Sequence, residues 1–181
     1  MERLTTPLRR IRYKLAATLD GFIAGPNGEA DWITTDPEID FKAIYAEFDT
    51  LLVGRRTFEV MAKAGRASVP GLRTVVFSRT LRPVDYPYVT VWAEQGLEAL
   101  AALRQAPGKD IWLFGGGSLF RSLLAAGLVD TVEVAIMPAL LGAGIPLLPS
   151  PAERALLTLT SHQVYQTGIV LLEYAVRRPA A

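Results

Sequence analysis

Apolar residues along this chain fall into short runs that glycine, proline or charged residues interrupt. Runs rich in β-branched and aromatic side chains predict strands, and longer stretches with apolar residues three and four positions apart predict helices. We expect strands over residues 12–17, 50–53, 74–77, 89–92, 111–114, 131–137, 155–165 and 169–176. We expect helices from near residue 36 to residue 48 and over 56–63, 97–104 and 119–126.

The first predicted helix has the clearest start signal. Asp36 is a preferred N-cap residue, Pro37 suits the first helical position, and Thr35 and Glu38 have the spacing of a capping box. Four apolar side chains then recur at helical spacing and should form one buried face: Phe41, Ile44, Tyr45 and Phe48.

Strands and helices alternate up to residue 126, and the remaining elements are strands alone. This order predicts an α/β three-layer sandwich, in which helices flank a mostly parallel central sheet that ends in an antiparallel C-terminal hairpin. We expect residues 1–10 to form a loose segment and residues 11–181 to form a single domain. Ligands of such sheets bind outside the carboxyl ends of the strands. Chemistry is therefore expected in the loops 18–32, 54–57, 78–80 and 115–118.

Composition narrows the classes of function. Half of the 181 residues are hydrophobic and the mean hydropathy is +0.25, yet no apolar run approaches the ~20 residues that span a membrane. The apolar excess therefore predicts strands covered on both faces and a buried subunit interface. A net charge of +1 argues against nucleic acid as a partner, and the absence of cysteine excludes disulfides and thiolate metal sites. We expect a cytoplasmic protein with no membrane partner and no metal.

Two strand-to-helix junctions have the composition of phosphate sites. The predicted strand 111–114 runs into Gly-Gly-Gly-Ser at 115–118. Glycines let a backbone approach a phosphate closely, and the start of a helix attracts negative charge. The junction at 54–57, Gly-Arg-Arg-Thr, adds two guanidiniums and a hydroxyl. A tight turn and a solvated basic turn are the respective alternatives.

A third junction follows the predicted strand 74–77. Ser78 and Arg79 supply a hydroxyl and a guanidinium there, and no acidic residue follows this strand directly. Sites for NAD often place an acidic residue at this point to bind the ribose 2′-hydroxyl. Three such junctions on one rim favour a dinucleotide with an extra 2′-phosphate.

Four segments, in their order and spacing, resemble the dihydrofolate-reductase-like superfamily: Leu15–Ile23, Val53–Phe58, Val75–Ser78 and Phe114–Gly117. Three others are more similar to the C-terminal reductase domain of the bifunctional riboflavin-biosynthesis deaminase–reductase: Trp32–Thr34, Ala126–Asp130 and Pro138–Gly142. The resemblance covers roughly residues 11–176. The deaminase half has no counterpart, because its zinc motif requires cysteine.

The resemblance implies that NADPH lies along the carboxyl edge of the sheet. The residues that would hold its pyrophosphate and the neighbouring phosphate are Gly54, Arg55, Arg56 and Thr57. Those near the 2′-phosphate would be Ser78 and Arg79. The residues that would line the path to the nicotinamide are Gly115, Gly116, Gly117, Ser118 and Leu119. The residues that would flank the nicotinamide ring are Ala16 and Ile23.

The substrate side departs from both branches of the superfamily. The riboflavin reductases usually have Glu at the position of Gly115, and dihydrofolate reductases have an acid at the position of Pro37, four residues before Phe41. Asp36 and Glu38 flank that position and are the candidate catalytic residues. Their alternative role is helix capping.

The expected function is hydride transfer from NADPH to a flat heterocycle, with Trp32 and Phe41 as substrate-binding residues. Core packing is the alternative for Trp32. By resemblance the substrate class is 5-amino-6-(5-phosphoribosylamino)uracil, with a dihydrofolate or another pterin as the alternative. A non-catalytic nucleotide-binding module on the same fold is a second hypothesis. His162, the only histidine, is expected to be structural.

The apolar excess and the resemblance both predict a homodimer. Edge strands of an antiparallel segment are prone to pairing with another chain. The interface candidates are therefore Val132, Val134, Ile136 and the hydrophobic residues of 169–176.

Overall fold

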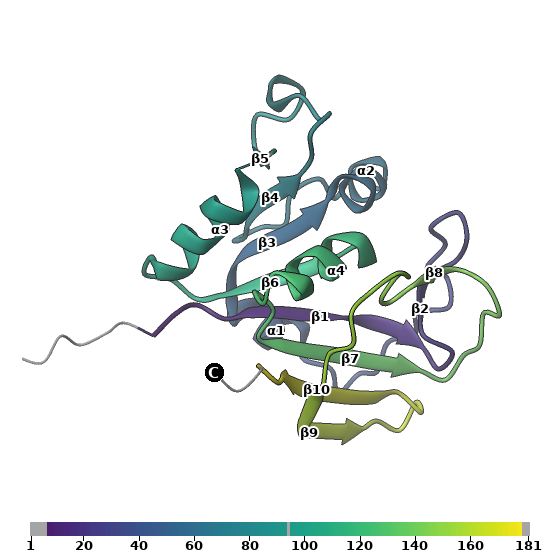
Figure 1. The fold of residues 1–181 in the computed structure, drawn as a ribbon. Helices are drawn as coiled ribbons and strands as arrows, with labels where there is room; N and C mark the ends of the chain where they lie inside the picture. Colours follow the sequence, from purple (N-terminus) through teal and green to yellow (C-terminus); the bar gives the residue numbers. More distant parts are fainter. Residues whose placement is uncertain (1–6, 94, 179–181) are drawn as a thin grey trace, which may run out of the picture.

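The computed structural model describes residues 7–93 and 95–178 (Figure 1). Its helices are α1 (Phe41–Ala46), α2 (Arg55–Lys63), α3 (Gly96–Gln105) and α4 (Gly117–Ala125), with a 3-10 helix at Pro83–Asp85. Its main sheet contains β1 (Ile11–Thr18), β3 (Phe48–Gly54), β4 (Arg73–Phe77), β5 (Thr90–Trp92), β6 (Asp110–Gly115), β7 (Thr131–Met137), β9 (Leu157–Val164) and β10 (Val170–Val176). A second sheet pairs β2 (Phe22–Ala24) with β8 (Ile145–Pro146). Among the described residues, no helix has the length and apolar character that crossing a membrane requires.

The main sheet has the strand order β5-β4-β3-β6-β1-β7-β10-β9. The first six of these strands are parallel to their neighbours, whereas β10 is antiparallel to both β7 and β9. The predicted fold class is confirmed, since helices flank a mostly parallel sheet that ends in an antiparallel hairpin. Because the parallel strands all end at one edge, the loops that follow them meet there, and we call this the carboxyl edge.

Apolar side chains alternate along the central strands and build a core on each face of the sheet. On one face, the ring of Tyr13 in β1 stacks on Phe120 of α4 with 3.8 Å between centroids, and Leu100 of α3 joins the same cluster. On the other face, Phe58 of α2 packs in a cluster with Trp112 of β6. Burying a side chain of this size stabilises the fold by about 1.5–3 kcal/mol. These contacts fix α4 and α2 on opposite faces of the sheet.

The predicted start of the first helix is wrong. α1 begins at residue 41, after the carboxylate of Asp40 accepts a hydrogen bond from the N–H of Ala43 at 2.9 Å. The carboxylate of Asp36, which was expected to cap the helix, instead accepts from the N–H of Glu38 and from Thr167 in the β9–β10 turn. A long-range contact therefore takes the predicted cap, and no capping box forms at this point.

The predicted buried face of this helix is also wrong. Phe41 and Tyr45 are 48% and 41% exposed, and Phe48 is buried in β3 rather than in the helix. Ile44 is partly buried against the cluster that contains Phe48. The spacing that predicted one long helix arose from a short helix followed directly by a strand.

The N-terminal boundary lies earlier than predicted. Arg9 is buried, its N–H donates to the carbonyl of Arg104 at 2.9 Å, and its Nε donates to the carbonyl of Lys109 at 2.6 Å. Residues 9 and 10 therefore belong to the folded domain rather than to a loose segment. Residues 1–6 and 179–181 lie outside the described part of the chain.

Two residues that were predicted at a subunit interface belong to the core. Val132 and Val134 in β7 are 5% and 6% exposed, because they pack within the cluster that α3 and α4 cover. Their assignment to an interface was wrong for that reason. The outer strand β9, in contrast, is exposed along its whole length.

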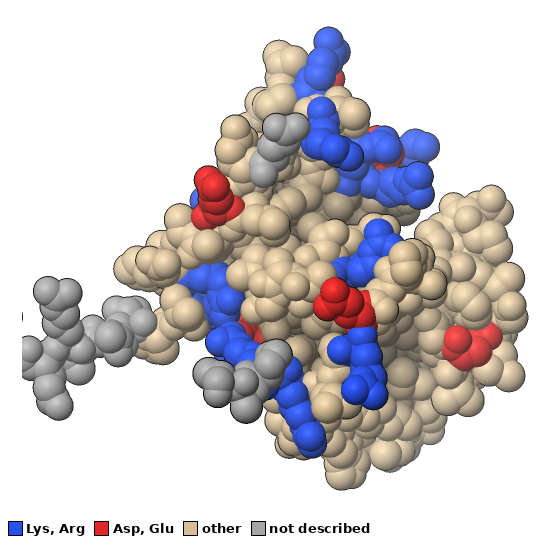
Figure 2. All heavy atoms as spheres, viewed as in Figure 1, with Lys and Arg blue, Asp and Glu red and all other residues tan. Residues whose placement is uncertain are grey.

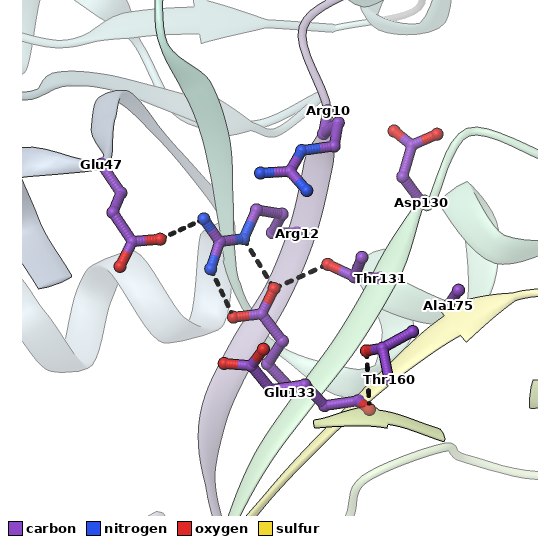
Figure 3. Close-up of a pocket in the computed structure, with 9 residues that line it drawn as sticks. Arg10, Arg12, Glu47, Asp130, Thr131, Glu133, Thr160 and Ala175 are labelled. Carbon is purple, nitrogen blue, oxygen red and sulfur yellow. Dashed lines mark hydrogen bonds and ion pairs between the residues drawn. The ribbon is translucent and has the colours of Figure 1, made fainter. Parts of the chain in front are cut away.

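A buried charge network joins β1 to β7 on the face that carries α1 (Figure 3). Glu133 accepts hydrogen bonds from Nε and Nη2 of Arg12 at 2.6 and 2.7 Å and from Nζ of Lys14 at 2.8 Å. Arg12 also pairs with Glu47 at the end of α1. Burial opposes the charge of Glu133, but the bonds from Arg12 and the charge of Lys14 outweigh it and lower the pKa of Glu133 to about 2.

Replacing Glu133 with Gln should lower the free energy of unfolding by about 3–5 kcal/mol, because Arg12 and Lys14 then lose their buried counter-charge. Urea denaturation measures this, with the exposed Glu153→Gln as a control expected to change stability by less than about 0.5 kcal/mol. The pKa of Glu133 is lower in the folded than in the unfolded chain, so its contribution is present above about pH 4.5 and lost as the pH falls towards 2. Equal stability of wild type and Glu133→Gln would contradict this assignment.

Candidate cofactor and substrate site

Two of the predicted phosphate junctions are in contact at the carboxyl edge. β3 and β6 are neighbours, with Val53 paired to Gly115. A Cβ atom at Gly54 would lie 3.7 Å from the backbone nitrogen of Gly116, and one at Gly116 would lie 2.9 Å from Oγ1 of Thr57. Segments 54–57 and 115–119 therefore form one continuous surface. The sequence prediction that one ligand contacts both segments requires this arrangement.

The helices that follow these junctions begin at this surface without a side-chain cap. α2 and α4 have Gly54 and Gly116 as their N-cap residues, neither with a side-chain cap, and neither first turn contains an acidic residue. Free N–H groups and the positive end of the helix dipole attract anions. Gly115 has a φ of +128°, a conformation that favours glycine. The geometry fits a phosphate group held between the two helix starts.

The third predicted junction lies beside segment 54–57, because β4 pairs with β3. Oγ of Ser78 accepts hydrogen bonds from the N–H groups of Thr80 and Leu81 at 3.2 and 2.9 Å, which fixes the turn that carries the exposed Arg79. In α2, Arg55 pairs with Glu59 at 2.8 Å. Figure 2 shows Lys and Arg gathered over α2 and the neighbouring end of the sheet. This side of the carboxyl edge is therefore cationic.

The turn after β1 is held by a carboxylate whose role the sequence did not reveal. Asp20 accepts hydrogen bonds from Oγ1 of Thr18 at 2.6 Å and from the N–H groups of Leu141 and Gly142 at 3.0 and 2.7 Å. The bond from Thr18, and then that from Gly142, lower the pKa of Asp20. Asp20 thus fastens the β1–β2 turn to the loop after β7. The Asp-Gly pair at a strand end signalled the turn but not its distant partner.

The predicted nicotinamide neighbours lie on different apolar clusters. Ala16 faces the α1 side of the sheet, beside a cluster of Met137, Tyr165 and Ile169. Ile23 in β2 packs against the core on the α4 side. The two side chains therefore belong to opposite walls of the edge where β1 ends.

The predicted substrate residues are separated as well. Trp32 is half-buried against the Met137, Tyr165 and Ile169 cluster, and its Nε1 donates to the carbonyl of Glu29 at 3.2 Å. Phe41 is about half exposed and is not part of that cluster. Trp32 thus forms part of an apolar wall at the carboxyl edge, and its ring also has the packing role that was considered as the alternative.

The two candidate catalytic acids lie in different environments. Asp36 is 4% exposed and accepts from the N–H of Glu38 at 2.9 Å and from N and Oγ1 of Thr167 at 3.2 and 2.8 Å. The bond from Glu38 lowers the pKa of Asp36 most, and Thr167 adds to the effect. Asp36 is therefore ionised near neutral pH, and Glu38 is exposed. As an ionised anchor, Asp36 fastens segment 29–40 to the β9–β10 turn.

Sequence reasoning did not single out Tyr165, a buried phenol whose hydroxyl is protonated at neutral pH. It is 8% exposed, and burial together with the charges of Asp36 and Glu38 raises its pKa. Its place at the end of the predicted strand 155–165, just before the turn at 166–168, was the only signal. Because that turn lies at the carboxyl edge, the hairpin brings Tyr165 and Thr167 to the loop that contains Asp36.

A depression of about 610 Å³ lies at the opposite, amino edge of the sheet (Figure 3). Its lining is mostly charged or polar: Arg10, Arg12, Glu47, Asp130, Thr131, Glu133, Thr160, Glu173 and Ala175. The basic side chains in it are paired with carboxylates. It has neither the glycine junctions nor the helix starts, so it is not the candidate site.

A family model for the RibD C-terminal domain matches residues 9–171. The uncharacterized Bacillus subtilis protein YyaP is 36% identical over 178 residues, which cover 92% of this chain and 94% of YyaP. The riboflavin biosynthesis protein RibD of Corynebacterium ammoniagenes is 30% identical over 171 residues, which cover 82% of this chain and 49% of that protein.

Solved structures show the same fold. A Shewanella sp. PV-4 protein assigned to riboflavin biosynthesis superposes with a TM-score of 0.80 at 24% identity, covering 94% of this chain and all of that one. Dihydrofolate reductase from Enterococcus faecalis, complexed with NADP(H), superposes with a TM-score of 0.68 at 19% identity, covering 93% of this chain and 97% of the reductase. At these identities the likeness extends to the fold alone.

Replacing Gly116 with Ala should weaken NADPH binding at least tenfold, because the added methyl group enters the surface between the two helix starts. Stability should fall only modestly, by about 1 kcal/mol, through the contact with Thr57. Calorimetric titration with NADPH and thermal unfolding measure the two effects. The double variant Gly116→Ala/Thr57→Ala should recover the stability without recovering the affinity. Normal NADPH binding by Gly116→Ala would mean that the glycines form only a turn.

Replacing Asp36 with Asn should lower thermal stability, because one oxygen that accepts from Thr167 or Glu38 is lost. Its lowered pKa means that the contribution of Asp36 is present above its ordinary value of 3.8 and is lost as the pH falls below it. The pH profile of turnover between pH 6 and 9 should stay unchanged. Thr167→Val removes the hydroxyl that donates to Asp36. The double variant Asp36→Asn/Thr167→Val should be little less stable than either single variant, because both changes break the same contact. Loss of one limb of the pH profile in Asp36→Asn would instead show a catalytic acid.

Proposed function

The chain belongs to the RibD C-terminal domain family, and from this membership we propose that it is a reductase that uses NADPH to reduce a small flat heterocycle. The observation that carries the proposal is the convergence of the uncapped starts of α2 and α4 on the cationic side of the carboxyl edge. A methyl group would fill the closest approach at Gly116, as expected of a surface shaped for a ligand. The predicted cytoplasmic location stays a prediction.

Bound NADPH would supply the hydride at this site. The N–H groups that follow Gly54 and Gly116 would hold its phosphates, and Ser78 and Arg79 would bind the 2′-phosphate. The wall that contains Trp32 would keep water away from the flat substrate. Because Asp36 is ionised, the proton would come from water or from the substrate itself.

The proposed substrate is an aminopyrimidine ring of the 5-amino-6-(5-phosphoribosylamino)uracil type, with a pterin as the alternative. One solved structure of the same fold, from Thermotoga maritima, is a 5-amino-6-(5-phosphoribosylamino)uracil reductase and deaminase, with a TM-score of 0.69. Oxidation of NADPH with panels of pyrimidine and pterin acceptors tests the proposal. Tight NADPH binding without turnover on any acceptor would favour a non-catalytic nucleotide-binding module.

Replacing Arg79 with Ala should weaken NADPH binding about tenfold while leaving NADH binding nearly unchanged, because only NADPH carries the 2′-phosphate that a guanidinium would bind. Dissociation constants for both cofactors measure this. Arg82→Ala is the matched control, since Arg82 lies nearby and pairs with Asp85 at 2.9 Å. Equal losses for NADPH and NADH in Arg79→Ala would remove the 2′-phosphate site from this loop.

We also propose that the protein is a homodimer that pairs through the β9–β10 hairpin. β9 is an exposed edge strand, and its Leu157, Leu159 and Val164 are 36%, 50% and 67% exposed. Leu159→Arg should convert a dimer to a monomer in light scattering at micromolar concentration, because it places a charge on the apolar face. Ser161→Arg, opposite Glu173 on the polar face, is the control and should leave the dimer intact. A monomeric wild type would refute the proposal.

A further inference from the structure

Charge is divided sharply between the two sides of the carboxyl edge. Segment 15–41 contains six of the eighteen acidic residues of the chain and none of its nineteen Lys and Arg residues. Segments 134–152 and 163–172 contain no charged residue. Trp32, Met137 and Leu171 from these three segments meet in one apolar cluster. We call the surface that these segments form the substrate side.

The basic residues of the edge belong to the cofactor side, at Arg55, Arg56 and Arg79. In Figure 2 Lys and Arg atoms gather over α2 and also appear at α4, whereas the lobe around β2 and β8 shows only acidic and uncharged atoms from this direction. The first basic residue after segment 15–41 is Lys42, whose side chain is exposed on α1. A second phosphate group, away from the cofactor, would therefore meet carboxylates.

Carboxylates of this side also occupy five backbone N–H groups that could otherwise bind an anion. Asp20 binds the N–H groups of Leu141 and Gly142, Asp36 binds those of Glu38 and Thr167, and Asp40 binds that of Ala43 at the start of α1. These bonds measure 2.7–3.2 Å. The donors that hold a phosphate in other proteins are thus satisfied here by the chain's own negative charge.

Two of these carboxylates are firmly ionised. Hydrogen bonds to Thr18 and Gly142 lower the pKa of Asp20, and those to Glu38 and Thr167 lower the pKa of Asp36. The negative charge of the substrate side therefore persists throughout the neutral pH range. Carboxylates near an anionic ligand repel it, and those near a cation attract it.

We infer that the substrate of this site carries no phosphate group and is an uncharged or positively charged nitrogen heterocycle. The inference rests on the proposed reductase function and narrows its substrate class. It separates the ring, which the apolar wall beside Trp32 accommodates, from the phosphoribosyl group, because segments 15–41, 134–152 and 163–172 contain no Lys or Arg that could bind its phosphate.

Binding to the complex of the protein with NADP⁺ tests the inference without turnover. The probes are 5-amino-6-(5-phosphoribosylamino)uracil and the riboside made from it by phosphatase, each titrated while tryptophan fluorescence is followed. The riboside should bind at least tenfold more tightly. Equal affinity, tighter binding of the phosphorylated compound, or binding of neither would overturn the inference for this ring. Failure of the protein to bind NADP⁺ at all would instead count against the proposed function.

A charge-reversal pair tests the physical cause. Glu38→Lys should bring the affinity for the phosphorylated probe to within about threefold of that for the riboside, because it replaces a repulsive charge with an attractive one. Glu153→Lys changes the net charge equally outside segments 15–41, 134–152 and 163–172 and should leave the tenfold gap intact. Higher salt should narrow the gap in the wild type, since exposed charges are screened over about 8–10 Å. An unchanged gap in Glu38→Lys would overturn the electrostatic explanation.

Discussion

The adjacency of β3 and β6 is the constraint on which the candidate site depends. Each strand ends in glycine, and the backbone at Gly116 lies so close to Thr57 that a methyl group would contact its hydroxyl at 2.9 Å. This approach brings the uncapped starts of α2 and α4 to one surface, although α2 and α4 pack on opposite faces of the sheet. Two helix starts that converge from opposite faces attract one anionic ligand more strongly than either does alone.

The other side of the same edge uses the opposite electrostatic arrangement. Asp20 and Asp36 each bind two backbone N–H groups, and each joins segments that are far apart in the sequence. These carboxylates make this side of the edge negative, beside a side that carries Arg55, Arg56 and Arg79. Two ligands bound at the edge would therefore meet surfaces of opposite charge.

The buried ion pairs and the candidate site are located at different edges of the sheet. The Arg12, Lys14 and Glu133 network lies on the face beside the amino edge, where its charges neutralise one another in a buried setting. Removing one partner of such a network leaves a buried charge without a counter-charge, which is strongly destabilising. The network therefore holds β1 against β7. The carboxyl edge, in contrast, leaves the starts of α2 and α4 without a side-chain cap and Arg79 exposed.

Local signals in the sequence were sufficient for the elements, the fold class and the glycine junctions, because hydrophobic period, turn residues and helix starts act over a few neighbouring residues. Local signals did not predict the structure of residues 36–48.

Asp36 has every local feature of an N-cap. However, Thr167, more than a hundred residues later, binds its carboxylate, and the helix begins after Asp40 instead. The sequence likewise predicted Val132 and Val134 at a subunit interface, but they are buried because β7 lies beside β1. Tyr165 and Thr167 joined the site through the same long-range packing. Contacts between distant segments depend on which strands become neighbours, and no local pattern specifies that order.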